Sequence, residues 1–162
     1  MCCSDLTEDD LVLLSHPNKL LIDHLRNVAG LARRVVEQYY PSGSDDFDKM
    51  VDAAYVVGLT HDIGKCTSYF QQRIRGLKPK TALGQHSKLS AVVTYYLFKN
   101  QFAEDDTAVI WLLYAYTSVL KHHGDLDDVA NMLLFEKNDQ SLLMHQVDSI
   151  CEESLRALSL KK

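Results

Sequence analysis

The chain has 162 residues, 46% of them apolar, which predicts a single domain over residues 1–162 with a core large enough to fold without disulfides. The net charge of -5 disfavours a broad nucleic-acid-binding face, since such faces are usually strongly basic. The four cysteines have no CxxC spacing, and the chain has neither a signal peptide nor an apolar run of about 18 residues. We therefore expect a cytoplasmic protein without a membrane segment.

Apolar residues recur at helical spacing along most of the chain, without strand alternation and hairpin signals, so an all-α fold is predicted. The first helix is expected over residues 17–40, because Pro17 is typical of a helix start and the sequence PSGS at residues 41–44 of a helix end. One face of this helix carries an apolar stripe that includes a histidine: Leu20, Leu21, His24, Leu25, Val28, Leu31, Ala32 and Val35.

Further helices are expected at about residues 46–64, 68–75, 86–100, 107–121, 127–135 and 140–158. The pair His61 and Asp62 lies near the carboxyl end of the first of these, where both side chains can turn toward one centre. A loop over residues 77–85 leads to His86 at the start of the next long helix. The segment 107–121 is strongly apolar and is expected to form the central buried helix.

Five histidines and one aspartate lie at ends of the expected helices or on the apolar stripe, and they are the candidate metal ligands: His24, His61, Asp62, His86, His122 and His123. A single histidine at such a place is more often a packed core residue or a cap. Five together, two of them adjacent at a helix end, favour a metal site. Imidazoles and one potentially bridging carboxylate suit two divalent ions of manganese, nickel, cobalt, iron or zinc, and they also allow magnesium. The other two histidines, His16 and His145, are expected at the surface or as caps.

Lys65 follows His61 and Asp62 by four and three residues, which places it on the same helical face if the helix continues that far. Two interpretations are open. Lys65 either forms an ion pair with Asp62, or its ammonium neutralises a phosphoryl oxygen as charge develops in a hydrolytic transition state. Asp62 and Lys65 are therefore the candidate catalytic residues.

Residues 65–88 contain no acidic side chain and carry six basic ones, which are the candidate nucleic-acid-binding residues: Lys65, Arg73, Arg75, Lys78, Lys80 and Lys88. A charge run of this kind is often no more than a solvated loop. This stretch, however, lies between the candidate ligands at residues 62 and 86. That position favours attraction of phosphates toward the site.

Three stretches of the sequence resemble the HD superfamily of metal-dependent phosphohydrolases, and more narrowly the HD nuclease of type I CRISPR interference. They are LTHDIGK at residues 59–65 with YFQ at 69–71, QHS at 85–87 with SA at 90–91, and KHHGDL at 121–126. The resemblance covers about residues 16–128 and implies a compact helical HD domain with the site in a cleft among helices. It further implies that Asp62 bridges two metals, one held with His24 and His61 and the other with His86, His122 and His123. Lys65 matches the lysine that follows the family motif.

The activity implied by this resemblance is phosphodiester hydrolysis, preferentially in single-stranded DNA, as endonuclease or exonuclease in CRISPR antiviral defence. The implied partners are single-stranded DNA, a CRISPR-associated helicase and a guide-RNA surveillance complex. One departure is that members usually add a late aspartate to the first metal, and no matching stretch occurs in the 39 residues after His123. The chain is then either a short stand-alone form or the front part of a longer, helicase-associated protein. Two alternatives stay open, namely an HD phosphohydrolase acting on nucleotides or cyclic dinucleotides and a catalytically degenerate HD docking module.

Overall fold

The computed structural model describes residues 12–101, 108–125, 128–133 and 137–150, together with residues 152, 155 and 156. Their helices are α2 (Leu21–Tyr39), α3 (Phe47–Thr60), α4 (Ser68–Ile74), α5 (Ser87–Gln101), α6 (Ala108–Leu120), α7 (Val129–Leu133) and α8 (Lys137–Asp148). Two 3-10 turns, η2 (Ile63–Cys66) and η3 (Ala82–Gly84), and two short strands, β1 (Leu14–His16) and β2 (Lys19–Leu20), complete this part of the chain. The predicted all-α class is therefore confirmed, and no helix in the described ranges is long and apolar enough to cross a membrane.

The expected helix start at Pro17 is wrong, because a small hairpin precedes the first long helix. Strands β1 and β2 pair antiparallel, and Pro17 and Asn18 form the turn between them. Asn18 has φ 61°, in the left-handed region that asparagine tolerates better than most residues, and proline suits the first corner of a turn. Strands of two and three residues are too short to show an alternating pattern in the sequence.

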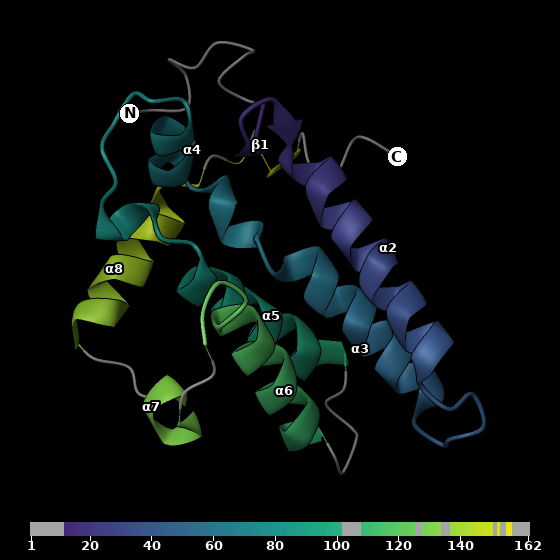
Figure 1. The fold of residues 1–162 in the computed structure, drawn as a ribbon. Coiled ribbons are helices and arrows are strands. Elements are labelled where there is room, and N and C mark those ends of the chain that lie inside the picture. The colour runs from purple at the N-terminus through teal and green to yellow at the C-terminus, as the bar shows by residue number, and fades with distance from the viewer. Residues whose placement is uncertain are drawn as a thin grey trace.

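Helices α2 and α3 run side by side (Figure 1) and pack closely at Gly58. A Cβ added to Gly58 would lie 2.6 Å from the Cα of Ala29 in α2, so only glycine fits there. The buried line of α2 runs through Leu21, Leu25 and Ala29. The expected stripe is therefore too wide, since two of its members, Leu31 and Val35, are 56% and 47% exposed and line a groove shared with α3 and α6.

Helix α6 is not the central buried helix that its apolar sequence predicts. Its inner face, with Tyr116 and Val119, packs on α5, whereas Val109 and Ile110 are 75% and 53% exposed.

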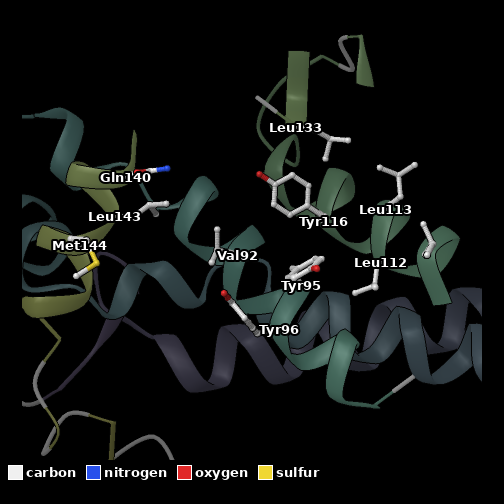
Figure 2. A pocket seen from close by; sticks show the side chains of 11 residues that line it. Val92, Tyr95, Tyr96, Leu112, Leu113, Tyr116, Leu133, Gln140, Leu143 and Met144 are labelled. Carbon is white, nitrogen blue, oxygen red and sulfur yellow. The ribbon is translucent and has the colours of Figure 1, made fainter. Parts of the chain in front are cut away.

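Helices α5 to α8 line an apolar pocket of about 740 Å³ (Figure 2), and none of the candidate metal ligands lines it. Helix α8 covers residues 137–148, and the expected helix over 140–158 is interrupted at residues 149–150. Of the rest of that expected helix, residues 152, 155 and 156 are helical and the others lie outside the described residues.

We expect Gly58→Ala to destabilise the fold by about 1–3 kcal/mol, since the added methyl group overlaps the α2 backbone. Gly30→Ala, in the middle of α2, is the matched control. Its Cβ would meet only the Arg34 side chain at 3.8 Å, so alanine should stabilise the helix by about 0.5–1 kcal/mol. Urea unfolding followed by circular dichroism measures both, and a neutral Gly58→Ala variant would contradict the close packing.

Candidate metal centre

The site is built around a break in helical structure at Asp62. Helix α3 ends just before His61, which still has helical angles, whereas Asp62 has φ -116° and ψ 11° and leaves the helix. Two adjacent side chains that would diverge by about 100° on a helix can therefore face the same centre. The following Gly64 donates its N–H to Ser90 Oγ at 2.9 Å, and a Cβ on it would lie 2.5 Å from the carbonyl oxygen of His86. Glycine thus lets the turn approach the start of α5.

One carboxylate oxygen of Asp62 faces the first group of histidines. Asp62 Oδ2 lies 2.8 Å from His24 Nε2 and 3.3 Å from His61 Nε2, and these two nitrogens are 3.2 Å apart. His24 comes from α2 and His61 from the end of α3. Two helices that pack side by side therefore each contribute one imidazole to the same oxygen.

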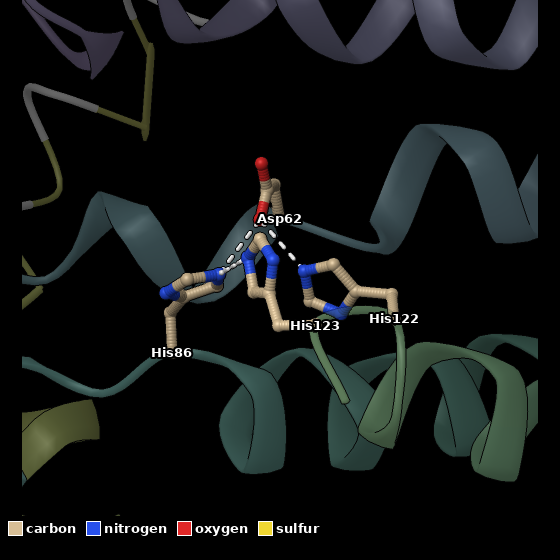
Figure 3. A group of neighbouring side chains, drawn as sticks. All are labelled: Asp62, His86, His122 and His123. Carbon is tan, nitrogen blue, oxygen red and sulfur yellow. Dashed lines mark hydrogen bonds and ion pairs between the residues drawn. The ribbon is translucent and has the colours of Figure 1, made fainter. Parts of the chain in front are cut away.

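The other oxygen of Asp62 faces the second group (Figure 3). Asp62 Oδ1 lies 2.8 Å from His86 Nε2 and 3.2 Å from His122 Nε2. His123 completes this group, with its Nε2 3.2 Å from that of His86. His86 immediately precedes α5, and the pair at residues 122 and 123 follows α6, so the antiparallel packing of α5 and α6 brings these ligand candidates together.

All six candidate ligands thus meet in two clusters that share Asp62. Within each cluster, one donor atom from every member lies within 4.8 Å of the others. His145 is exposed on α8 and belongs to neither cluster, whereas His16 is exposed but lies beside His24. A carboxylate with one oxygen in each cluster is placed as a bridging ligand would be.

The tautomers of His61 and His122 fit bound cations. The Nδ1–H of His61 donates to Gly58 O at 2.7 Å, and that of His122 donates to Val119 O at 2.6 Å. In the neutral ring, the Nε2 of each histidine is then unprotonated, and it faces an oxygen of Asp62. Two atoms with lone pairs repel each other at this distance, and a cation bound between them would remove the repulsion. Backbone acceptors that fix the tautomer in this way are typical of metal-binding histidines.

Burial and charge set the protonation of the site. Burial raises the pKa of the Asp62 carboxyl, but contacts with His122, His61 and His86 and with the Lys65 ammonium outweigh this effect and hold the pKa well below its usual range. Burial lowers the pKa of both His24 and His86 despite their contacts with Asp62. Burial and the neighbouring imidazoles lower the pKa of His123 to about 4. A charged carboxylate with neutral imidazoles is the state that binds divalent metals.

For His122, burial lowers the pKa, but hydrogen bonds with Asp62 and with the Val119 carbonyl outweigh this effect and raise it. Its neutral form is therefore favoured less than that of His24, His86 or His123. A cation bound at Nε2 would compete directly with that proton.

Lys65 is 4% exposed and belongs to the same centre. Its Nζ lies 2.7 Å from Asp62 Oδ2 and donates to Ser15 O at 3.3 Å. The ion pair with Asp62, one of the two interpretations of the sequence, is thus present. It is formed from the 3-10 turn η2, because the expected α-helix does not continue to this residue.

Two buried glutamines support the site, and the sequence analysis assigned no role to either. The Gln71 amide nitrogen donates to Lys65 O at 2.7 Å and to Leu14 O at 2.9 Å, joining η2 to the hairpin. The Gln146 amide nitrogen, from α8, donates to Leu83 O at 2.9 Å and to Gln85 O, just before His86. Both lie at inward-facing positions of helices. Gln71 belongs to the YFQ stretch of the resemblance, whereas nothing in the sequence distinguishes Gln146 from a surface glutamine.

The basic stretch divides into anchored and exposed side chains. Arg73 donates to Gly84 O at 3.1 Å, and Arg75 donates to Val12 O at 2.5 Å. Lys88 pairs with Asp139 of α8 at 2.7 Å. Lys78 and Lys80 lie in the loop after α4 and are exposed.

Fold and site together define a helical metal-binding domain, in which histidines from several helix ends surround one shared carboxylate. The chain belongs to the HD domain family, whose model matches residues 21–150 and so includes every candidate ligand. Members of this family are metal-dependent hydrolases.

Among curated proteins, the chain is similar to the CRISPR-associated endonuclease Cas3-HD of Methanocaldococcus jannaschii. The two are 25% identical over 120 residues, which is 68% of this chain and 48% of the relative. The chain therefore spans about half the length of the curated relative it matches. No solved structure matches the chain.

We expect the protein, after removal of metal by a chelator and dialysis against Mn²⁺, to bind two ions per chain by elemental analysis. Asp62→Ala should lose both, since its carboxylate serves both clusters. His24→Ala and His123→Ala should each lose one. His145→Ala, an exposed histidine away from the clusters, is the control and should keep two. Equal losses in Asp62→Ala and His24→Ala would contradict a division into two sites.

Proposed function

We propose that this chain is a metal-dependent nuclease that hydrolyses phosphodiester bonds, preferentially in single-stranded DNA. The observation that supports this most directly is the shared carboxylate, with Asp62 Oδ2 in one histidine cluster and Oδ1 in the other. A pair of divalent ions supplies, when bound, an activated water and stabilisation of the attacking and leaving oxygens of an in-line displacement. The manganese, nickel, cobalt, iron, zinc or magnesium ions expected from the ligand types remain candidates.

The side chains of the site would act mainly by position and charge. Asp62 holds its negative charge at the centre because contacts with the surrounding imidazoles and with the Lys65 ammonium keep its pKa low. Lys65 adds a buried positive charge beside Oδ2, and a preorganised charge in a site with little water stabilises developing negative charge on phosphate strongly. Gly58 O and Val119 O keep the rings of His61 and His122 oriented throughout.

The basic stretch would track the DNA backbone without reading sequence. Lys78 and Lys80, which are exposed, would contact phosphates directly. The side chains of Arg73, Arg75 and Lys88 hold the stretch against η3, the segment before β1 and α8, and would present their charge from those positions.

The setting we propose is CRISPR antiviral defence in the cytoplasm, where a CRISPR-associated helicase and a guide-RNA surveillance complex would deliver the target strand. The proposal is supported by the similarity to a protein named CRISPR-associated endonuclease Cas3-HD and by the motifs around residues 61, 86 and 122. This HD domain would then be the nuclease component of a larger assembly.

The purified chain with Mn²⁺ should cut a labelled single-stranded DNA, and a circular substrate beside a linear one distinguishes endonuclease from exonuclease action. His61→Ala should lower the rate by about 100-fold or more, because ion-based stabilisation contributes several kcal/mol to the transition state. His145→Ala should cut at the unaltered rate.

Two results would overturn this proposal. Release of phosphate or nucleoside from nucleotides, with the DNA left intact, would identify a nucleotide phosphohydrolase. A chain with neither bound metal nor hydrolytic activity would be a docking module.

Lys78→Ala/Lys80→Ala should weaken binding to single-stranded DNA and reduce its salt dependence. Each phosphate contact on a single strand contributes about 0.7 to the slope of log K against log salt, so the slope should fall by about 1.4. The control is Lys49→Ala/Lys99→Ala, which removes the same charge near the ends of α3 and α5 that lie away from the site. An unchanged slope in the first variant would contradict a backbone contact by this loop.

A further inference from the structure

His16 stands at one end of a continuous row of imidazoles. Its ring centroid lies 5.1 Å from that of His24, and the row continues from His24 to His61 at 5.0 Å and from His61 to His122 at 5.3 Å. His16 is exposed and belongs to neither ligand cluster. It therefore extends the row from the first cluster outward to the protein surface.

The hairpin that carries His16 is fixed to the site by buried side chains. The Gln71 amide accepts from Leu14 N at 3.0 Å and donates to Leu14 O at 2.9 Å. Lys65, the partner of Asp62, donates to Ser15 O at 3.3 Å. Both residues preceding His16 are thus hydrogen-bonded to side chains of α4 and η2, so its backbone position is set by the same contacts that build the site.

The hydrogen bonds of Ser15 determine which nitrogen of His16 is available. The Ser15 hydroxyl donates to Lys19 O at 3.3 Å, so its oxygen accepts from the Nδ1–H of His16 at 3.2 Å. In the neutral ring, Nε2 then carries a lone pair, as it does in His61 and His122. His16 is therefore a hydrogen-bond acceptor at the edge of the first cluster.

We propose that Nε2 of His16 accepts a hydrogen bond from the water that attacks phosphorus and orients it for attack. Phosphate oxygens are themselves acceptors, so an acceptor nitrogen beside a phosphodiester needs a donor, and in hydrolysis the attacking water provides one. The first cluster also has two imidazoles where the second has three, so the chain itself offers an ion fewer ligands on this side.

In the reaction, the water oxygen forms a bond to phosphorus as the bond to the leaving sugar oxygen breaks. The attacking water gives up one proton to solvent and the leaving oxygen takes one from solvent, so the products are a phosphate monoester and a sugar hydroxyl, while His16 keeps its own Nδ1 proton. His16 acts on the water alone, so it is a positioning residue. This inference rests on the proposed phosphodiester hydrolysis.

The test compares three substitutions. Glutamine can present its amide oxygen near the place of Nε2, whereas asparagine reaches only the place of Nδ1, and alanine reaches neither. The substrates are bis(p-nitrophenyl) phosphate and single-stranded DNA, both with Mn²⁺, and the control is His145→Ala.

We expect His16→Ala and His16→Asn to lower kcat by about 10- to 100-fold with little change in KM, because misplacing a reactant lowers the rate of the chemical step and leaves substrate affinity nearly unchanged. His16→Gln should recover most of the loss.

Metal content provides a readout that does not depend on activity. Each His16 variant should bind as many Mn²⁺ ions as the unaltered chain. Loss of an ion in His16→Ala would make His16 a ligand and overturn the proposal, as would a kcat within twofold of the unaltered value or no recovery by glutamine. If the small diester is hydrolysed with the expected His16 dependence while DNA stays intact, the inference stands and the nuclease proposal fails.

Discussion

The structure depends on one buried charge, the carboxylate of Asp62, which is 1% exposed. A carboxylate removed from water destabilises the fold unless it is paired and hydrogen-bonded. Here it meets four imidazoles and one ammonium, and these come from the α2 helix, the end of α3, η2, the start of α5 and the end of α6. The requirement to satisfy this charge therefore joins elements that are far apart in sequence, and the same requirement prepares a site for cations.

The supporting contacts explain why so many polar groups are buried near the site. Gln71 joins the hairpin to η2, and Gln146 joins α8 to the segment before His86. The hydroxyl oxygen of Ser90 accepts a hydrogen bond from the N–H of Gly64. Buried amides and hydroxyls are stabilising only when their partners are present. The turn at Asp62 is thus held from three sides, which keeps the imidazoles in place before any ion or substrate binds.

Much of the candidate site could be predicted from sequence because its signals are local. The pairs at residues 61–62 and 122–123 each follow a helix, and a helix end lets adjacent side chains face one centre. The hairpin before α2 could not be predicted, since its strands of three and two residues are too short to show the alternation of apolar and polar residues that marks a strand. Without recognisable strands on both sides, Asn18 with its left-handed φ does not stand out as a hairpin turn. Two predictions were also wrong, namely the width of the buried stripe on α2 and the burial of α6. Apolar periodicity shows which face of a helix is buried only when a neighbouring helix covers its full length.

By itself, the sequence determined the helical class, the identity of the six candidate ligands and the basic character of residues 65–88, because composition, helical periodicity and residue chemistry are properties of short segments. The resemblance to the HD superfamily already implied that Asp62 is shared. Only the tertiary structure placed one oxygen of Asp62 in each cluster, decided between the two interpretations of Lys65 by burying it against Asp62, and placed His16 in the row of imidazoles. These are relations between residues up to 60 positions apart, such as His122 and Asp62. They arise from helix packing and buried hydrogen bonds, which no local pattern of residues encodes.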